Sequence, residues 1–219
     1  MARGLFVTGT GTGVGKTVVS AALMARLSDG RALRYWKPVQ TGIEVDDDTS
    51  TVMALSGCGA SGVLDDGIRL PNPVSPHLAA RLAGIRIQVP DLVTRFEREA
   101  PASWIVEGAG GVLVPLDDIT MMTTLMQALA MPVVVAARSE LGTINHTLLT
   151  LEALRMRRLS IAGVVMVGHP NAENRAAIEH YGGVSVLGEL PVMDPLIADG
   201  LAQWARQALD PTNLLGAWL

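Results

Sequence analysis

One segment of the chain reads Gly9-Thr10-Gly11-Thr12-Gly13-Val14-Gly15-Lys16-Thr17, between an apolar run at residues 5–8 and a helical pattern that begins at Lys16. Glycines let backbone N–H groups turn inward and approach an anion closely. The N-terminus of the following helix adds partial positive charge. In this setting Lys16 would reach the β- and γ-phosphates of a nucleotide, and the Thr17 hydroxyl would ligate Mg²⁺. The strict motif has Gly where Thr10 stands, so the alternative is a glycine-rich turn without a ligand. We interpret the segment as a phosphate-binding loop.

Short apolar runs alternate with longer helical patterns through the rest of the chain. Strands are expected at residues 5–8, 34–36, 104–106, 132–137, 161–167 and 184–187, and helices at 16–28, 91–99, 120–130, 144–158, 173–181 and 196–209. The run at 132–137 is almost wholly apolar, which indicates burial on both faces, as in a parallel sheet covered by helices. The alternation predicts a doubly wound α/β fold of P-loop NTPase type, with a mostly parallel sheet, helices on both faces and one domain spanning residues 1–219.

Composition excludes several classes of protein. Because 49% of the 219 residues are hydrophobic, the chain can bury a sizeable core. A net charge of −4 gives no broad basic field, so we expect no nucleic-acid partner. The single cysteine, Cys58, excludes an internal disulfide framework and suits a reducing compartment. No apolar run reaches ~18 residues, and the N-terminus lacks the pattern of a signal peptide. We therefore expect a cytoplasmic protein without a membrane partner.

The chain uses lysine sparingly. Of its 17 basic Lys and Arg side chains, two are lysines, Lys16 and Lys37, and each follows one of the first two expected strands. Lysine carries a compact charge on a flexible stem, whereas arginine is a broad planar fork. Ligands of doubly wound folds bind at the carboxyl ends of the strands. Two point cations beside one phosphate would explain the pattern, and chance in an arginine-biased composition is the alternative.

Carboxylates follow two of the expected strands. Asp46-Asp47-Asp48 lies after the second strand, and Glu107 ends the run at 104–106, ahead of an expected Gly-Ala-Gly-Gly turn. Magnesium prefers oxygen ligands and takes few of them from protein. Thr17, one of the aspartates and Glu107 would supply such ligands. A solvated acidic loop and a purely structural Glu107 remain as alternatives.

A further candidate for anion binding is the segment Gly142-Thr143-Ile144-Asn145, which opens the helix expected at 144–158. Its free N–H groups could hold a carboxylate. An ordinary N-cap by Thr143 is the alternative.

Taken together, these motifs resemble the dethiobiotin synthetase family. The blocks that carry the resemblance occur in the family's order and are residues 7–17, Lys37-Pro38-Val39-Gln40-Thr41-Gly42, Ser75-Pro76-His77, Val106-Glu107-Gly108-Ala109-Gly110-Gly111, residues 141–146 and Leu187-Gly188-Glu189-Leu190-Pro191. The phosphate loop alone is shared with many enzymes, and its combination with the lysine and glutamate blocks is specific.

The resemblance implies an ATP-dependent ring closure in biotin synthesis. The substrate would be 7,8-diaminopelargonate, whose one amine captures CO₂ as a carbamate that attacks the γ-phosphate of a Mg–nucleotide. The second amine then attacks the mixed anhydride, which gives a cyclic urea and releases phosphate. The resemblance also implies a homodimer with the substrate near the subunit interface.

The resemblance assigns roles residue by residue. The catalytic residues would be Lys37, Lys16 and Thr12. The nucleotide would be bound by Gly11, Thr12, Gly13, Val14, Gly15, Lys16, Thr17, Glu107, Gly108, Gly110, Gly188, Leu190 and Pro191. The substrate would be bound by Thr12, Lys37, Thr41, Gly142, Thr143, Ile144 and Asn145. Magnesium would be held by Thr17, Asp48 and Glu107.

The chain departs from the family pattern at two places. Many members carry an acidic residue where Gly13 stands. Many also have Asn after the strand that corresponds to 161–167, where this chain has Gly168 and His169. Because that Asn reads the nucleobase, the expected co-substrate is ATP or another nucleoside triphosphate.

Two other functions compete with this interpretation. A partition- or carrier-type P-loop ATPase usually has a second lysine early in the loop, where this chain has Gly11. An amidoligase that acts on a larger corrin acid would need room for an appended glutaminase domain, and 219 residues are short for that.

Overall fold

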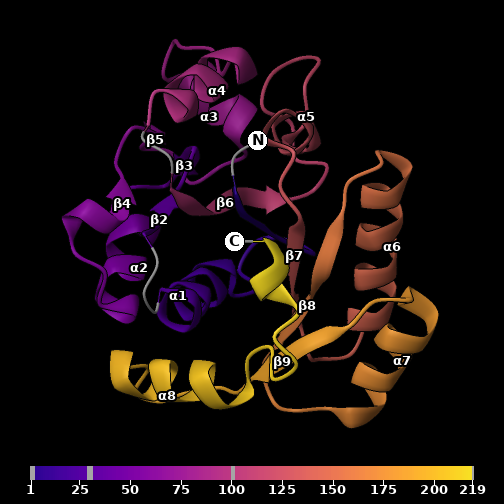
Figure 1. The fold of residues 1–219 in the computed structure, drawn as a ribbon. Helices are drawn as coiled ribbons and strands as arrows, with labels where there is room; N and C mark the ends of the chain where they lie inside the picture. The colour runs from indigo at the N-terminus through magenta and orange to yellow at the C-terminus, as the bar shows by residue number, and fades with distance from the viewer. Residues whose placement is uncertain (1–2, 29–31, 100–101, 219) are drawn as a thin grey trace.

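The main sheet has seven parallel strands in the order β4-β2-β6-β1-β7-β8-β9 (Figure 1). The computed structural model describes residues 3–28, 32–99 and 102–218. The strands of the main sheet are β1 (Arg3–Gly9), β2 (Leu33–Trp36), β4 (Val63–Leu64), β6 (Ser103–Gly111), β7 (Val133–Arg138), β8 (Ile161–Val167) and β9 (Val186–Leu190). A second, small parallel sheet pairs β3 (Val39–Thr41) with β5 (Ile68–Leu70).

Helices cover both faces of the main sheet. One face packs against α1 (Lys16–Leu27), α2 (Asp48–Ser56) and α8 (Ala198–Ala208). The other face packs against α3 (Pro76–Leu82), α4 (Val89–Glu97), α5 (Met122–Leu129), α6 (Thr143–Met156) and α7 (Ala172–Gly182). Figure 1 shows α8 beside α1, with α6 and α7 on the opposite side of the strands β7 to β9. Two single 3₁₀ turns, at Ala60–Gly62 and Leu215–Trp218, complete the elements.

Alternation along the strands divides the apolar residues between two cores. In β1, Leu5 and Val7 point to the core under α1, whereas Phe6 points to the core under α4 and α5. All three side chains are completely buried. Successive side chains of a strand point to opposite faces, so a sheet covered on both sides needs continuous apolar runs. This arrangement confirms the predicted α/β fold with helices on both faces.

The strand that contains Glu107 is longer than the sequence indicated. The expected Gly-Ala-Gly-Gly turn is wrong, because β6 continues through it and Gly111 pairs with Gly9 of β1. A side chain at Gly108 would place its Cβ 2.9 Å from the ring of Phe6. The glycines therefore allow the strand to run close to β1 rather than turn away from it.

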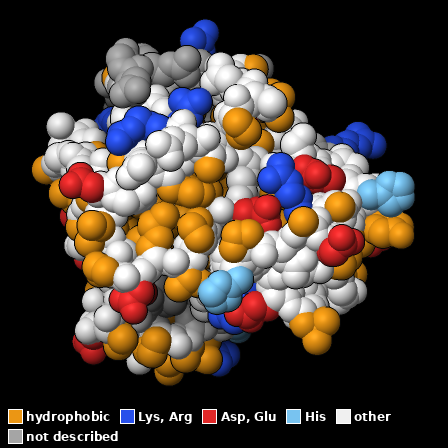
Figure 2. Space-filling view, turned by 90° about the horizontal axis from the view of Figure 1, so that it is seen from below, with side chains coloured by type: hydrophobic (Ala, Val, Ile, Leu, Met, Phe, Trp, Pro, Cys, Tyr) orange, Lys and Arg blue, Asp and Glu red, His pale blue; other side chains and the backbone are white. Residues whose placement is uncertain are grey.

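One face of the molecule has a patch of exposed hydrophobic side chains (Figure 2). Seen from below the view of Figure 1, hydrophobic side chains gather in a patch left of centre, with charged side chains mostly around it (Figure 2). Within the described ranges, no helix is long and apolar enough to cross a bilayer.

Candidate functional site

The phosphate loop connects the central strand β1 to helix α1. Gly13 and Gly15 adopt left-handed backbone conformations with φ of 69° and 91°, which an L side chain rarely adopts. Gly15 also packs against β8, since a Cβ there would lie 2.9 Å from Val167. The loop therefore needs glycine at these two positions, and it stands at the carboxyl end of the sheet, where ligands of doubly wound folds bind.

Lys16 lies inside this loop. Its side chain is buried, and Nζ donates a hydrogen bond to the Gly11 carbonyl at 2.9 Å. Burial and the nearby Lys37 ammonium lower the pKa of Lys16 to about 8, although Glu107 and Asp48 oppose the shift. The structure thus brings both lysines of the chain within electrostatic reach of one another.

A second cluster stands beside the loop, where β2 and β6 meet α1 and α2. Lys37 Nζ lies 2.6 Å from Glu107 Oε1 and 2.7 Å from Asp48 Oδ2. The Thr17 hydroxyl donates to Asp48 Oδ1 at 2.6 Å and lies 3.2 Å from Glu107 Oε1. Four residues that are distant in sequence thus form one network, which joins the phosphate loop to the carboxylates.

The charges in this cluster stabilise one another. Burial alone would lower the pKa of Lys37, but Glu107 and Asp48 outweigh it and raise the pKa above its usual value. Burial alone would raise the pKa of Asp48, but Lys37 and the Thr17 hydroxyl hold it below its usual value. Both groups are therefore charged at neutral pH, and neither ion would be stable at this depth without the other.

The three consecutive aspartates have different positions relative to helix α2, which begins at Asp48. Asp47 is the N-cap, accepts hydrogen bonds from the backbone N–H groups of Thr49 and Ser50, and pairs with Arg69 at 2.8 Å. Asp46 is exposed, whereas Asp48 begins the helix and faces Lys37. The interpretation of all three as a solvated acidic loop is therefore wrong for Asp47 and Asp48.

The donor set suits a magnesium ion. Thr17, Asp48 and Glu107 offer a hydroxyl and two carboxylates: both carboxylates contact the Lys37 ammonium, and the Thr17 hydroxyl lies within hydrogen-bond distance of both carboxylates. Among the described residues no group of three or more His, Cys, Asp or Glu side chains gathers as a metal site. Magnesium usually keeps several waters and binds through one or two carboxylates plus substrate phosphates, so the small donor set fits.

Sequence reasoning missed two residues of this region. The Tyr35 hydroxyl donates to Glu107 Oε2 at 3.0 Å, and both side chains are completely buried. Arg138, at the end of β7, donates to the Gly13 carbonyl in the phosphate loop at 3.1 Å. Tyr35 could have been noticed as a polar group two residues before Lys37 in a buried strand, whereas nothing in the sequence pairs Arg138 with Gly13.

A cavity of about 380 Å³ lies next to the phosphate loop. It is lined from the loop by Thr10, Gly11 and Thr12, from β6 and its extension by Gly111, Val112, Leu113 and Val114, and from α6 by His146, Leu149, Thr150 and Ala153. Thr12 is exposed toward this space. The cavity thus connects the loop to α6 from His146 to Ala153, and the segment predicted to bind a carboxylate, residues 142–145, lies just before this stretch and is not among the lining residues.

The start of α6 differs in detail from an ordinary cap. Gly142 is the N-cap, with φ of 92°, and no side chain caps the helix. Thr143 lies inside the helix, and its hydroxyl donates to the Arg138 carbonyl. The alternative of an N-cap by Thr143 is therefore wrong, and anion binding by Gly142, Thr143, Ile144 and Asn145 stays a prediction.

Other predicted site residues lie in separate elements. Thr41 ends β3 in the small sheet, and Pro191 follows β9. Gly188 is buried in β9, where a Cβ would lie 3.0 Å from the Ala208 carbonyl of α8. Packing against α8 thus explains this glycine without a ligand, and its contact with nucleotide stays a prediction, as do those of Leu190 and Pro191.

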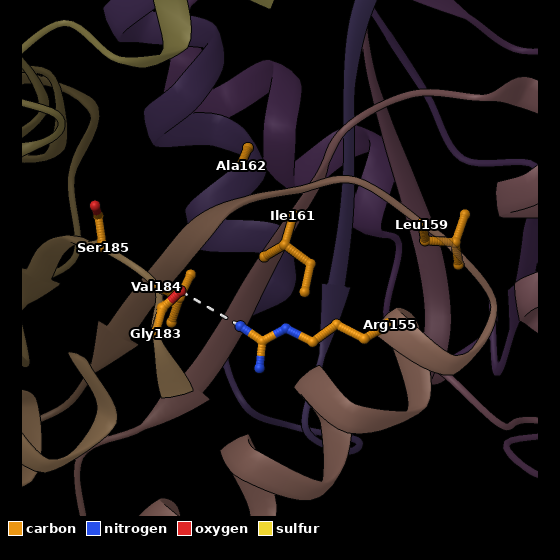
Figure 3. Close-up of a pocket in the computed structure, with 7 residues that line it drawn as sticks. All are labelled: Arg155, Leu159, Ile161, Ala162, Gly183, Val184 and Ser185. Atoms are coloured by element: carbon orange, nitrogen blue, oxygen red, sulfur yellow. Dashed lines mark hydrogen bonds between the residues drawn. The ribbon is translucent and has the colours of Figure 1, made fainter. Parts of the chain in front are cut away.

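A second hollow, of about 500 Å³, lies at the opposite end of the sheet (Figure 3). It is bordered by the start of β8 and by the chain that leads into β9, and the guanidinium of Arg155 reaches across it to the carbonyls of Gly182 and Gly183. Because it faces the amino ends of the strands, it is not where a doubly wound fold binds its ligand. At this hollow, Arg155 links the end of α6 to the end of α7.

The fold and the phosphate loop define a P-loop nucleotide-binding domain. Residues 3–199 match the AAA_26 family, described as an AAA domain. The septum site-determining protein MinD from Pyrococcus horikoshii, complexed with Mg-ADP, superposes with a TM-score of 0.59 at 16% identity, over 98% of this chain and 93% of that one. A ParA family ATPase from Chlorobium tepidum gives 0.58 at 9% identity, over 93% and 97%. At these identities the likeness concerns the fold.

Curated relatives identify the family more narrowly. The ATP-dependent dethiobiotin synthetase BioD of Paramagnetospirillum magneticum is 47% identical over 91% of this chain and 93% of its own length. That of Nitrobacter hamburgensis is 46% identical over 93% and 92%. The biotin biosynthesis bifunctional protein BioCD of Bordetella avium is 45% identical over 98% of this chain, which spans 45% of that larger protein. The chain belongs to the ATP-dependent dethiobiotin synthetase family, which confirms the resemblance stated from its motifs.

Proposed function

We propose that this chain is an ATP-dependent ligase of biotin biosynthesis that closes the ureido ring of dethiobiotin from 7,8-diaminopelargonate and CO₂. The observation that carries the proposal is the cluster of Lys37, Glu107, Asp48 and Thr17 beside a phosphate loop. Family membership supports the same activity, because relatives that are 45–47% identical over about nine tenths of this chain are dethiobiotin synthetases.

The proposed reaction has three covalent steps: carbamate formation, phosphoryl transfer and ring closure. The carbamate formed from one amine and CO₂, with loss of a proton, attacks the γ-phosphorus through an oxygen and displaces ADP. The nitrogen of the second amine then attacks the carbonyl carbon, the C–O bond to phosphate breaks, and phosphate leaves as that nitrogen loses a proton. Positioning both amines beside one carbon makes the closure intramolecular, so proximity supplies much of the rate.

The lysines would supply the electrostatic part of catalysis. Lys16 lies in the loop and would neutralise the β- and γ-phosphates, and Lys37 would face the carbamate and the transferred phosphoryl group. Thr12 and Thr41 would hydrogen-bond the carbamate. Mg²⁺, held by Thr17, Asp48 and Glu107, would neutralise charge that develops on the phosphate oxygens when it is bound.

The cavity beside the loop suits the rest of the substrate. Its walls are mostly apolar, with Leu113, Val114 and Leu149 among them, and could hold the alkyl chain of a nine-carbon acid. The start of α6 would receive the substrate carboxylate at the N–H groups of its first turn other than that of Thr143, which donates to the Glu140 carbonyl at 3.1 Å.

A homodimer would complete this site. Leu149 and Met156, seven residues apart on α6, are 56% and 76% exposed, and Leu113 beside the cavity is 48% exposed. Leu113 and Leu149 line the cavity and Met156 lies farther along the same helix, and exposed apolar side chains of this kind are typical of a surface that a partner covers. We place the enzyme in the cytoplasm.

Phosphate release in the presence and absence of the diamine tests the proposal. Purified protein with ATP, Mg²⁺ and bicarbonate should release phosphate only when 7,8-diaminopelargonate is added. Phosphate release that does not depend on the diamine would contradict the ligase activity. Phosphate release with a corrin acid in place of the diamine would favour an amidoligase.

A further inference from the structure

Tyr35 is a buried polar residue to which the proposed reaction gives no role. It lies in β2, opposite Ile105 of β6, and is completely buried. Tyr35 and Ile105 belong to the core under α1, and Glu107, two residues after Ile105, points to the same face. The pleat of two neighbouring strands thus places the phenol directly against the carboxylate.

The two oxygens of Glu107 have different partners. Oε1 lies 2.6 Å from Lys37 Nζ and 3.2 Å from the Thr17 hydroxyl, on the side of the phosphate loop. Oε2 accepts the hydrogen bond of the Tyr35 hydroxyl at 3.0 Å. Because Glu107 is completely buried, water does not supply a substitute donor, and a buried carboxylate oxygen without a partner is costly.

We propose that Tyr35 is a positioning residue that fixes the rotation of the Glu107 carboxylate, so that a single oxygen, Oε1, faces the cation-binding side of the site. The proposal rests on the proposed function, because it assigns Tyr35 the task of setting the affinity of Thr17, Asp48 and Glu107 for a divalent cation. Hydrogen-bond partners of metal ligands orient those ligands and commonly change metal affinity by 10–100-fold.

Tyr35 faces the Glu107 carboxylate as a buried, neutral phenol. Burial raises the pKa of Tyr35 well above its usual value, and the nearby Glu107 and Asp48 carboxylates raise it further.

The test compares Tyr35→Phe with Tyr181→Phe, which alters the other tyrosine of the chain. Tyr181 is 71% exposed and lies in α7, so its variant controls for the loss of a phenol alone. Mn²⁺ binding to the protein with ADP is measured by electron paramagnetic resonance, and ADP binding without metal by calorimetry. We expect Tyr35→Phe to weaken Mn²⁺ binding by at least ~10-fold, with metal-free ADP affinity unchanged and Tyr181→Phe like the original protein.

Three other outcomes would distinguish a failure of the positioning role of Tyr35 from a failure of the metal site. Equal Mn²⁺ affinity in Tyr35→Phe and the original protein would overturn the positioning role while leaving the metal site intact. Weakened binding of both Mn²⁺ and metal-free ADP would indicate a merely structural role and overturn the proposal. Absence of Mn²⁺ binding in the original protein would overturn the metal site and the proposal together.

A measurement on the unaltered sequence guards against a variant that does not fold. Protein grown on 3-fluorotyrosine carries two fluorines, because the chain has two tyrosines. We expect Mg²⁺ added to the ADP complex to shift the Tyr35 ¹⁹F resonance and leave that of Tyr181 in place. A Tyr35 resonance whose chemical shift does not change when Mg²⁺ is added would contradict the proposal.

Discussion

One ammonium group, that of Lys37, holds the carboxylates of this site together. Lys37 is the ammonium group that neutralises Glu107 and Asp48, and Lys16 lies close enough for its pKa to be lowered by Lys37. Breaking a buried ion pair on one side leaves the other charge unpaired, which typically costs more than the pair contributes. A change of Lys37 should therefore appear in stability as well as in turnover, whereas a change in the charge of Lys16 should appear in nucleotide binding.

Replacing Lys37 by glutamine should abolish turnover and leave nucleotide binding in place, because the phosphate loop is unaltered. The variant should also lose about 3–5 kcal/mol of stability, since two carboxylates remain without their cation. Mg²⁺ with ADP should recover part of this loss in thermal unfolding. Arg69→Gln is the control, because it removes an ion pair at the surface, worth about 0–1 kcal/mol. A Lys37→Gln enzyme that still turns over would remove Lys37 from the mechanism.

Lys16 should make nucleotide binding pH-dependent. A polyphosphate favours the charged ammonium, so above the pKa of about 8 binding must take up a proton. Metal-free ADP affinity should fall by up to about tenfold per pH unit above this value. Calorimetry at several pH values, in two buffers of different ionisation enthalpy, measures both affinity and proton uptake. A constant affinity from below to above the pKa would contradict the assignment.

The same shift has a consequence for stability without nucleotide. Between about 8 and 10.5, unfolded Lys16 binds more protons than folded Lys16. The Lys16 contribution to the free energy of unfolding should therefore rise with pH across that window.

At the scale of elements, short segments place the carboxylates. Helix α2 begins at Asp48 because Asp47 caps it, and Glu107 lies within β6, which continues beyond it through the segment where a turn was expected. Asp48, at the start of α2, and Glu107, in β6, thus both point toward Thr17 of the phosphate loop.

Asp47→Ala should therefore affect the metal site indirectly, through the start of helix α2. Loss of the cap should cost about 1 kcal/mol, and fraying of the first turn should weaken Mn²⁺ binding by displacing Asp48. Asp47→Asn keeps the cap and loses only the charge facing Arg69, so it should retain most of both quantities. Chemical denaturation and metal titration check this, and equal metal affinity in all three proteins would show that the cap does not position Asp48.

At the scale of the whole molecule, the apolar surface beside the cavity suits a second copy of the chain. In a dimer the exposed side of α6 would be buried, together with the cavity mouth near Leu113 and Leu149. The substrate would then lie between two copies, and its binding would depend on assembly.

Leu149→Asp should convert a dimer of twice 23.1 kDa into monomers and weaken binding of the diamine, with ADP affinity unchanged. Leu82→Asp on α3 is the matched control, since the two leucines are 56% and 60% exposed. Light scattering after gel filtration gives the mass. A monomeric original protein would contradict the dimer, and a Leu149→Asp dimer would place the interface elsewhere.

The fold class and the phosphate loop were predictable from the sequence because both depend on local patterns. Continuous apolar runs identify buried parallel strands, and glycines with Lys16 and Thr17 after the first strand identify the loop. The short strands β3, β4 and β5 and the helices α2 and α3 were missed, because segments of two to nine residues carry too little periodicity.

Sequence by itself determined which residue types this protein brings to a nucleotide: a glycine loop, two lysines and a few carboxylates. Only the tertiary structure decided which of them meet. Sheet pairing sets β2 beside β6, so Lys37 and Tyr35 reach opposite oxygens of Glu107, and the cap of α2 turns Asp48 rather than Asp47 inward. Such contacts join residues 31 to 90 positions apart, and they arise from packing between elements, which no local pattern encodes.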